Sequence, residues 1–240
     1  MSIEQQDSPR KLLVTGASGG IGSAITHRLL NAGHQVVALG RDLSRWPKQA
    51  GLDKRTLDLA ALDALPQLLA EITADHSDLD GAILSAGSGH FGNLEEFSYQ
   101  QINDLVAINL TQHLYLTRAL VPLFKKSARG DLIIIGSEAG LSGGRKGAVY
   151  SACKFALRGF AQSMRAECSA SGIRVSLINP GMVDTDFYEN LNFKPGEKPE
   201  NALRAEDIAH AVMLVLEAHP GTVFDEINLN PLKKVIAFKN

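Results

Sequence analysis

The sequence predicts a single α/β domain, a doubly wound and mostly parallel seven-stranded sheet flanked by helices. Short apolar runs alternate with helical patterns of about ten residues or more along the whole chain, which is the pattern of βαβ units. The first apolar run leads into a glycine-rich turn that opens a helix, an arrangement that doubly wound folds use to bind nucleotides. No repeat, low-complexity tract or linker divides residues 1–240, so we expect one domain.

The composition is that of a soluble globular protein, with 45% hydrophobic and 21% charged residues. A net charge of −2 gives no electrostatic footprint for nucleic acid or an acidic membrane. Cys153 and Cys168 fit neither a zinc site nor a disulfide framework, and the scattered histidines suggest no metal site. Because we find no signal peptide and no apolar run of transmembrane length, we expect a cytoplasmic protein without nucleic-acid or membrane partners.

The first half of the chain carries four expected strands, at residues 12–15, 35–39, 55–57 and 81–85. A helix over 21–32 follows the glycine-rich turn and ends at Gly33. A second helix is expected over 60–73, with Pro66 in its first turns, because proline breaks a helix interior. Residues 1–9 are expected to be a flexible lead-in.

The second half repeats the alternation, with strands expected at 131–136, 173–179 and 222–229. Long helices are expected over 99–126, 147–169 and 205–218, the first with a kink at Pro122. Residues 182–201 contain prolines and a glycine, and they are expected to form an irregular segment.

The glycine-rich turn predicts a nucleotide site. Its residues Gly16, Ser18, Gly19, Gly20, Ile21 and Gly22 lie between a strand and a helix. Glycines there let the backbone turn sharply and let a pyrophosphate approach the helix N-terminus, where free N–H groups favour negative charge. The alternative is a connector without a ligand. The spacing Gly-x3-Gly-x-Gly also differs from the commonest dinucleotide fingerprint.

Tyr150 and Lys154 are the candidate reactive pair. Four residues apart on a helix, they share one face. A nearby ammonium favours the phenolate and would lower the pKa of Tyr150 towards the working range of an acid or base. Such a pair taken alone is more often one packing residue and one solvated residue.

Three features together resemble the short-chain dehydrogenase/reductase family over nearly the whole chain: Thr15-Gly16-x3-Gly20-x-Gly22, Ser137, and Tyr150-x3-Lys154. Asn109, Asp58 and the segment from Pro180-Gly181 to Thr185 also match the family pattern. One segment departs from it, since the Asn-Asn-Ala-Gly after the fourth strand is Leu84-Ser85-Ala86-Gly87 here. That difference bears on local rigidity more than on catalysis. The resemblance implies a Rossmann-like fold.

The resemblance also implies a hydride-transfer site with four catalytic residues. Tyr150 would exchange a proton with the substrate oxygen, and Ser137 would orient the carbonyl and stabilise charge on its oxygen. Lys154 would lower the pKa of Tyr150 and hold the nicotinamide ribose. Asn109 would hold a water that relays protons to Lys154, and Thr185 would contact the carboxamide. Taken singly, Ser137 and Thr185 could be helix caps and Asn109 a core hydrogen-bonding residue.

The residues expected to contact the cofactor come from the ends of several strands. They are Gly16, Ser18, Gly19, Gly20, Ile21, Gly22, Arg41, Asp58, Leu59, Ala86, Gly87, Asn109, Tyr150, Lys154, Pro180, Gly181, Val183 and Thr185. Gly40 stands where relatives that prefer NAD carry Asp, and Arg41 follows where an arginine can accept a 2′-phosphate. Asp42 is a competing carboxylate, so NADP(H) is expected while NAD(H) stays open.

The function expected from the resemblance is an NADP(H)-dependent oxidoreductase of the ketone/aldehyde reductase type. The alternatives are a dinucleotide-binding regulatory protein without turnover and a nucleotide-sugar epimerase or dehydratase. Residues 182–201 would form a lid that places Phe187, Tyr188 and Phe193 on the substrate. His90 could line the pocket, and Cys153 should face away from it. Pairing of the helices over 99–126 and 147–169 would give a homodimer or homotetramer.

Overall fold

The computed structural model describes residues 9–239 and contains the expected sheet. Its seven strands are β1 (Lys11–Thr15), β2 (Gln35–Gly40), β3 (Leu52–Thr56), β4 (Gly81–Leu84), β5 (Gly130–Ile135), β6 (Ile173–Pro180) and β10 (Glu226–Leu229). Their order is β10-β6-β5-β4-β1-β2-β3, and every neighbouring pair is parallel. The predicted doubly wound sheet is therefore confirmed. The predicted lead-in lies, except for Pro9, outside the described residues.

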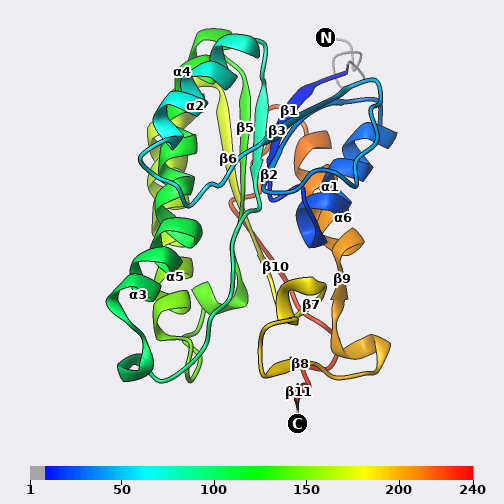
Figure 1. Ribbon diagram of the computed structural model, residues 1–240. Coiled ribbons are helices and arrows are strands. Elements are labelled where there is room, and N and C mark those ends of the chain that lie inside the picture. The colour runs from blue at the N-terminus through cyan, green and yellow to red at the C-terminus, as the bar shows by residue number, and fades with distance from the viewer. Residues whose placement is uncertain (1–8, 240) are drawn as a thin grey trace.

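Helices cover both faces of the sheet (Figure 1). One face carries α1 (Gly20–Asn31) and α6 (Ala205–Glu217), and the other carries α2 (Leu65–Asp75), α4 (Gln112–Ser127) and α5 (Ala148–Cys168). Each layer has its own apolar core, and the strand side chains alternate between the two. In β5, for example, Ile134 packs with one layer and Ile133 with the other, which explains why the run is apolar throughout.

The long helix expected over 99–126 is interrupted, and not where it was expected. It consists of α3 (Tyr99–Val106), a π-helical segment η3 (Ala107–Thr111) and α4. Pro122 stays inside α4 on its exposed face, where solvent can pair the carbonyl that loses its helical donor. The helix continues through Pro122, so the kink expected there stays a prediction, and the irregular turn lies around Asn109.

The segment after β6 holds more regular structure than its composition suggested. We call residues 182–201 the lid segment. It contains β7 (Val183–Asp184), η6 (Asp186–Tyr188), β8 (Phe193–Pro195) and η7 (Pro199–Asn201). β7 pairs with β9 (Leu203–Arg204), and β8 pairs antiparallel with β11 (Ile236–Phe238). These small sheets lie below the carboxyl ends of the central strands in Figure 1.

Other boundaries differ by a few residues from the expected ones. β3 begins three residues earlier than predicted, and α2 begins five residues later, which leaves Pro66 in its first turn as required. The last parallel strand starts at Glu226 instead of residue 222, because residues 219–222 form a turn in which the Thr222 N–H donates to the His219 carbonyl. Three more short helices complete the described fold: η2 (Leu94–Glu96), η4 (Glu138–Gly140) and η5 (Ser169–Ser171).

A charged cluster closes the amino-terminal edge of the sheet. The Arg10 guanidinium lies 2.7 Å from the Asp131 carboxylate and 3.1 Å from Asp80. Arg174 approaches Asp131 from the other side at 2.7 Å and also donates to the Ala218 carbonyl at the end of α6. Asp131 is almost fully buried, and two guanidinium groups compensate its charge. The cluster ties β1, β5, β6 and α6 together.

Candidate active site

A cleft of about 980 Å³ opens at the carboxyl ends of the central strands, and a neighbouring cavity of about 460 Å³ shares its floor. Seventeen of the expected cofactor residues, all but Asn109, line one or both of them, as does Ser137. Asp58 and Leu59 line only the smaller cavity, beside Arg41. The structure thus brings together residues that are spread from position 16 to position 185 of the chain.

The glycine-rich turn forms the floor of the cleft. Gly16 and Gly20 have φ values of +71° and +49°, a conformation that side chains rarely adopt. A Cβ on Gly22 would lie 2.3 Å from the Gly16 carbonyl oxygen, so only glycine lets α1 begin so close to the turn. Gly19 caps α1 and has no side chain to cover its first N–H groups. The turn therefore leaves a clear, positively polarised surface that fits a pyrophosphate.

The end of β2 favours a basic side chain over an acidic one in the cleft. A Cβ on Gly40 would lie 2.2 Å from the Ser18 hydroxyl and 3.2 Å from the Ser18 backbone nitrogen, so an aspartate fits there only if the Ser18 side chain turns away and the backbone gives slightly. Arg41 lines both cavities. The competing carboxylate of Asp42 accepts a hydrogen bond from the Ser44 N–H at 2.9 Å, which also lowers its pKa. The Asp42 carboxylate is thus hydrogen-bonded within its own turn.

Arg45 is a site residue that the sequence reasoning missed. Its guanidinium lies 3.7 Å from the point where a Gly19 side chain would begin. Trp46 holds this loop in place, because its indole N–H donates to the Ala17 carbonyl at 2.8 Å and its ring is buried. Lys54 donates to the Trp46 carbonyl at 2.7 Å and fixes the loop from β3. The adjacent Trp46 was the only sequence signal that could have pointed to this loop.

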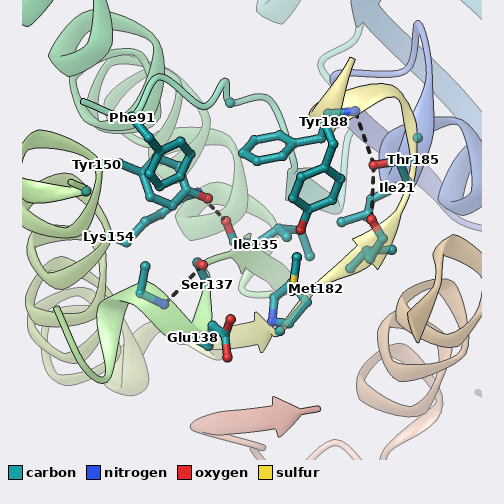
Figure 2. Close-up of a pocket in the computed structure, with 18 of the residues that line it drawn as sticks. Ile21, Phe91, Ile135, Ser137, Glu138, Tyr150, Lys154, Met182, Thr185 and Tyr188 are labelled. Atoms are coloured by element: carbon teal, nitrogen blue, oxygen red, sulfur yellow. Dashed lines mark hydrogen bonds between the residues drawn. The ribbon is translucent and has the colours of Figure 1, made fainter. Parts of the chain in front are cut away.

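Ser137, Tyr150 and Lys154 gather at the opposite wall. Ser137 follows β5, and Tyr150 and Lys154 lie on successive turns of α5. The Ser137 hydroxyl lies close enough to the Tyr150 phenol to lower its pKa, and the Lys154 ammonium lies 5.7 Å from the centre of the Tyr150 ring. Figure 2 shows the three on one side of the cleft, with Met182, Thr185 and Tyr188 of the lid segment across it.

Burial is the largest influence on the pKa values of Tyr150 and Lys154. It raises the pKa of Tyr150 to about 12, which the hydrogen bond to Ser137 opposes and the charge of Glu138 reinforces. Burial also lowers the pKa of Lys154 to about 8, although its ammonium donates to the Ile135 carbonyl at 3.2 Å. The predicted lowering of the Tyr150 pKa by Lys154 is therefore wrong for this structure, in which desolvation outweighs the neighbouring charge.

Asn109 lies behind the cleft instead of lining it. Its amide donates to the carbonyls of Ser88 and Leu105, at 2.9 and 3.0 Å, and its oxygen accepts from the Ser88 N–H at 3.1 Å. A Cβ on Gly87 would lie 2.9 Å from the Asn109 oxygen and 3.7 Å from the Lys154 nitrogen. Asn109 therefore fixes the strand-end loop that passes directly over Lys154.

Two of the candidate site residues also have structural roles. The Ser137 hydroxyl accepts from the Ala139 N–H at 3.1 Å and caps η4. The Thr185 hydroxyl accepts from the Phe187 N–H at 3.4 Å and caps η6. Both hydroxyls also line the cleft, so capping fixes their positions there.

The remaining candidate residues lie in three different places. Phe187, Tyr188 and Phe193 line the main cleft, together with Phe91. His90 lines the smaller cavity and packs edge-on against Phe97, with ring centres 4.9 Å apart. Cys153 is buried, and its sulfur points to the Leu105 carbonyl.

The described residues offer neither a metal site nor a helix that could span a membrane. Residues 9–239 hold no cluster of three or more His, Cys, Asp or Glu side chains that could bind a metal ion. Within the same range, every helix is too short or too polar to cross a membrane.

Comparison with known proteins places the chain in a family. The sequence profile described as short chain dehydrogenase matches residues 10–195. The NADP-dependent 3-hydroxy acid dehydrogenase YdfG of Escherichia coli K12 is 31% identical over 242 residues, covering 92% of this chain and 93% of YdfG. An uncharacterized oxidoreductase of Staphylococcus epidermidis is 28% identical, covering 92% of this chain and 96% of the relative.

Solved structures agree with the sequence comparison. A closed form of serine dehydrogenase complexed with NADP+ has a TM-score of 0.79 at 27% identity, covering 91% of this chain and 93% of the other. A metagenomic short-chain oxidoreductase in complex with NADP also has a TM-score of 0.79, at 28% identity and 96% and 100% coverage. The chain therefore belongs to the short-chain dehydrogenase family, as its motifs predict, and is an oxidoreductase.

Proposed function

We propose that this oxidoreductase uses NADP(H) to interconvert a carbonyl compound and an alcohol, with reduction of a ketone or aldehyde as the physiological direction. The observation that carries the proposal is that Ser137, Tyr150 and Lys154 line one cleft together with the glycine-rich turn. Family membership supplies the reaction type, and relatives named as NADP-dependent support the cofactor.

The reaction needs a hydride at the carbonyl carbon and a proton at its oxygen. The reduced nicotinamide supplies the hydride when bound. Tyr150, whose high pKa keeps it protonated at neutral pH, donates the proton, and the products are an alcohol and NADP+. Ser137 donates a hydrogen bond to the carbonyl oxygen as negative charge builds up on it. Alcohol oxidation uses the same groups in reverse.

Lys154, Asn109 and Thr185 have supporting roles in this proposal. The ammonium of Lys154 holds the nicotinamide ribose and replenishes the Tyr150 proton. Asn109 keeps the Gly87–Ser88 backbone in place above Lys154, and the bent π-helical backbone around it is where a relaying water would bind. Thr185, fixed as a cap of η6, holds the carboxamide.

The phosphate groups of the cofactor have two candidate cationic partners. Arg41 would pair with the 2′-phosphate from the end of β2. Arg45 lies 3.7 Å from the point where a Gly19 side chain would begin and would add a second positive charge from the neighbouring loop. The two arginines would hold the adenosine end of NADP(H) against the glycine-rich turn.

Calorimetric titration with NADPH and NADH, followed by assay of Tyr150→Phe, tests the proposed function. We expect tighter binding of NADPH than of NADH. Tyr150→Phe should keep NADPH affinity within about two-fold and lose at least about 10²-fold in kcat, because the ring remains but the transferable proton is gone. Absence of binding for both dinucleotides, or full activity of Tyr150→Phe, would refute the proposal.

We also propose that the protein is a cytoplasmic homo-oligomer. The exposed apolar side chains Leu114 and Tyr115 of α4 and Phe155 of α5 support pairing through these two helices. The cysteines Cys153 and Cys168, both free and buried thiols, are compatible with a reducing compartment. Light scattering on wild type and Phe155→Glu tests the assembly, and the variant should dissociate.

A further inference from the structure

Five aromatic side chains surround the reacting end of the cleft. Phe91, Tyr150, Phe187, Tyr188 and Phe193 form a closed circuit of ring contacts, which we call the aromatic collar. The centres are 5.2 Å apart for Phe91–Tyr150 and Phe91–Phe193, 5.1 Å for Phe187–Tyr188, 5.8 Å for Tyr188–Phe193 and 6.1 Å for Tyr150–Phe187. All five line the cleft, so the proton-donating Tyr150 is itself part of an apolar wall.

The surroundings hold the collar in place. A Cβ on Gly89 would lie 2.5 Å from the Phe187 ring, so glycine is needed for that ring to lie against the loop after β4. Phe193 pairs with Phe238 in the β8–β11 ladder, and Lys239 donates to the Tyr188 and Glu189 carbonyls. Three separate parts of the chain therefore build one apolar surface, and the part in the lid segment is held by β11 and Lys239.

The charges beside the collar disfavour a small anionic substrate. Glu138 follows Ser137 directly and lines the cleft, and its charge helps to raise the pKa values of both Tyr150 and Tyr188. Lys234 is already paired with Glu138 at 2.8 Å. A substrate carboxylate next to Glu138 would meet its negative charge, and the cation beside Glu138, Lys234, is already engaged.

Two more cations line the cleft at a different place. Arg145 and Lys146 are exposed on the loop between η4 and α5, and neither makes an ion pair within residues 9–239. Lys146 lies close enough to Glu96, which is outside the cleft, to lower the pKa of that carboxyl. The Lys146 backbone carbonyl accepts from the Gly92 N–H at 2.8 Å. Arg145 and Lys146 thus line the same cleft as the collar and Glu138, on a loop that reaches the Phe91 ring at Gly147.

We propose that the cleft selects neutral carbonyl compounds whose carbonyl carbon bears an aryl ring or a comparably bulky apolar group. The proposal rests on the proposed function and names its substrate class. Each ring contact with the collar would add about 0.5–1.5 kcal/mol beyond area burial, or about two- to ten-fold in affinity. The relatives named for 3-hydroxy acids and serine act on charged compounds, so this chain would differ from them in specificity.

The test compares kcat/KM for two matched pairs of substrates with NADPH. Acetophenone against acetone tests the ring, and ethyl acetoacetate against acetoacetate tests the charge. We expect at least about ten-fold preference for the aryl ketone and for the neutral ester. Oxidation of 1-phenylethanol, 3-hydroxybutyrate and serine with NADP+ tests the same preference in reverse. Calorimetry of 1-phenylethanol on the NADP+-loaded enzyme gives a readout independent of turnover.

Matched variants assign the preference to the collar. Phe187→Leu should raise KM for acetophenone about ten-fold and leave that for acetone unchanged. Phe97→Leu, which alters an aromatic side chain that packs on His90 outside the main cleft, should change neither. Glu138→Gln should reduce the discrimination against acetoacetate. Thermal unfolding of each variant checks that it is folded.

The outcomes separate the substrate class from the reaction. A higher kcat/KM for 3-hydroxybutyrate or serine than for 1-phenylethanol, or equal effects of Phe187→Leu and Phe97→Leu, would overturn the aryl proposal and leave the oxidoreductase standing. Binding of NADPH without turnover of any compound in the panel would overturn the proposed function and the substrate class with it.

Discussion

Lys154 is a residue at which function and stability should conflict. Burial lowers its pKa from 10.5 to about 8, so at neutral pH the folded state holds a charged ammonium that burial disfavours. Lys154→Met removes that cost, along with one hydrogen bond to Ile135. We expect the free energy of unfolding at pH 7 to rise by about 1–3 kcal/mol while activity is lost. Urea denaturation measures this change.

The pH dependence gives Lys154→Met an internal control. Between pH 8 and 10.5 the folded wild type releases the Lys154 proton while the unfolded chain keeps it, so the unfolded state binds more protons and stability rises with pH. Lys154→Met lacks this rise in stability. Its gain in free energy of unfolding over the wild type should therefore shrink between pH 8 and 10.5. A constant difference from pH 7 to 10.5 would show that packing, not the buried charge, sets its stability.

Arg41 and Arg45 should have separable effects on cofactor binding. Arg41→Ala should weaken NADPH binding about 10- to 100-fold and barely change NADH binding, because it removes a charge-assisted partner of the 2′-phosphate. Arg45→Ala should weaken NADPH binding by a smaller factor. Lys48→Ala is the matched control on the same loop, and calorimetry provides the affinities. Equal losses for NADH and NADPH in Arg45→Ala would place Arg45 at the pyrophosphate instead.

The residues found from sequence were those fixed by local spacing. Tyr150 and Lys154 are one helical turn apart whatever surrounds them, and the glycine-rich turn is set by its own backbone requirements. Arg45 and Glu138 could not be identified in this way. Arg45 reaches Gly19 only because Trp46 anchors its loop, and Glu138 meets Lys234, which lies ninety-six positions later.

At the scale of elements, the π-helical segment η3 links chain geometry to the site. It places Asn109 so that its amide holds both polar backbone groups of Ser88. We expect Asn109→Leu to lower the free energy of unfolding by about 1–3 kcal/mol and to weaken NADPH binding, because the freed loop passes over Lys154. Denaturation and calorimetry measure both. Asn103→Leu, exposed on α3, is the control and should do neither.

Elements defined by a long periodic pattern were predictable, and those defined by distant partners were not. The helices over 147–169 and 205–218 match α5 and α6 within one residue at each end. The π-helical turn escaped notice because its extra residue leaves the apolar pattern of both flanking helices intact. β8 and β11 are three residues each, and only their pairing across forty positions makes them strands.

At the scale of the whole molecule, the two ends of the sheet have different roles. The carboxyl ends carry the site, and the amino ends carry the Arg10–Asp131–Arg174 cluster. Asp131→Asn should destabilise the fold by about 3–5 kcal/mol, because two buried guanidinium groups would lose their shared partner. kcat/KM of the remaining folded enzyme should be unchanged.

Asp78→Asn is the matched control for the charged cluster. Asp78 pairs with Lys11 at 2.9 Å on the same edge of the sheet, but its side chain is 66% exposed. Its loss should change the free energy of unfolding by less than about 1 kcal/mol. Equal destabilisation by Asp78→Asn and Asp131→Asn would mean that burial does not determine how much the charged cluster contributes to the free energy of unfolding.

The fold as a whole was the most predictable level. Alternation of strands and helices allows few topologies once crossovers are right-handed, and the observed seven-stranded order is one of them. The β8–β11 sheet does not follow from this rule, because it depends on where residues 236–238 return to the lid segment.

The chain contains a single tryptophan, and the fold places it beside the cofactor cleft. Trp46 is buried, its indole N–H is bonded to the glycine-rich turn, and the arginine next to it approaches Gly19. Tryptophan emits light in the region where reduced nicotinamides absorb. Occupancy of the cleft should therefore quench the intrinsic emission of the protein, so that Trp46 acts as a built-in optical reporter without any added label.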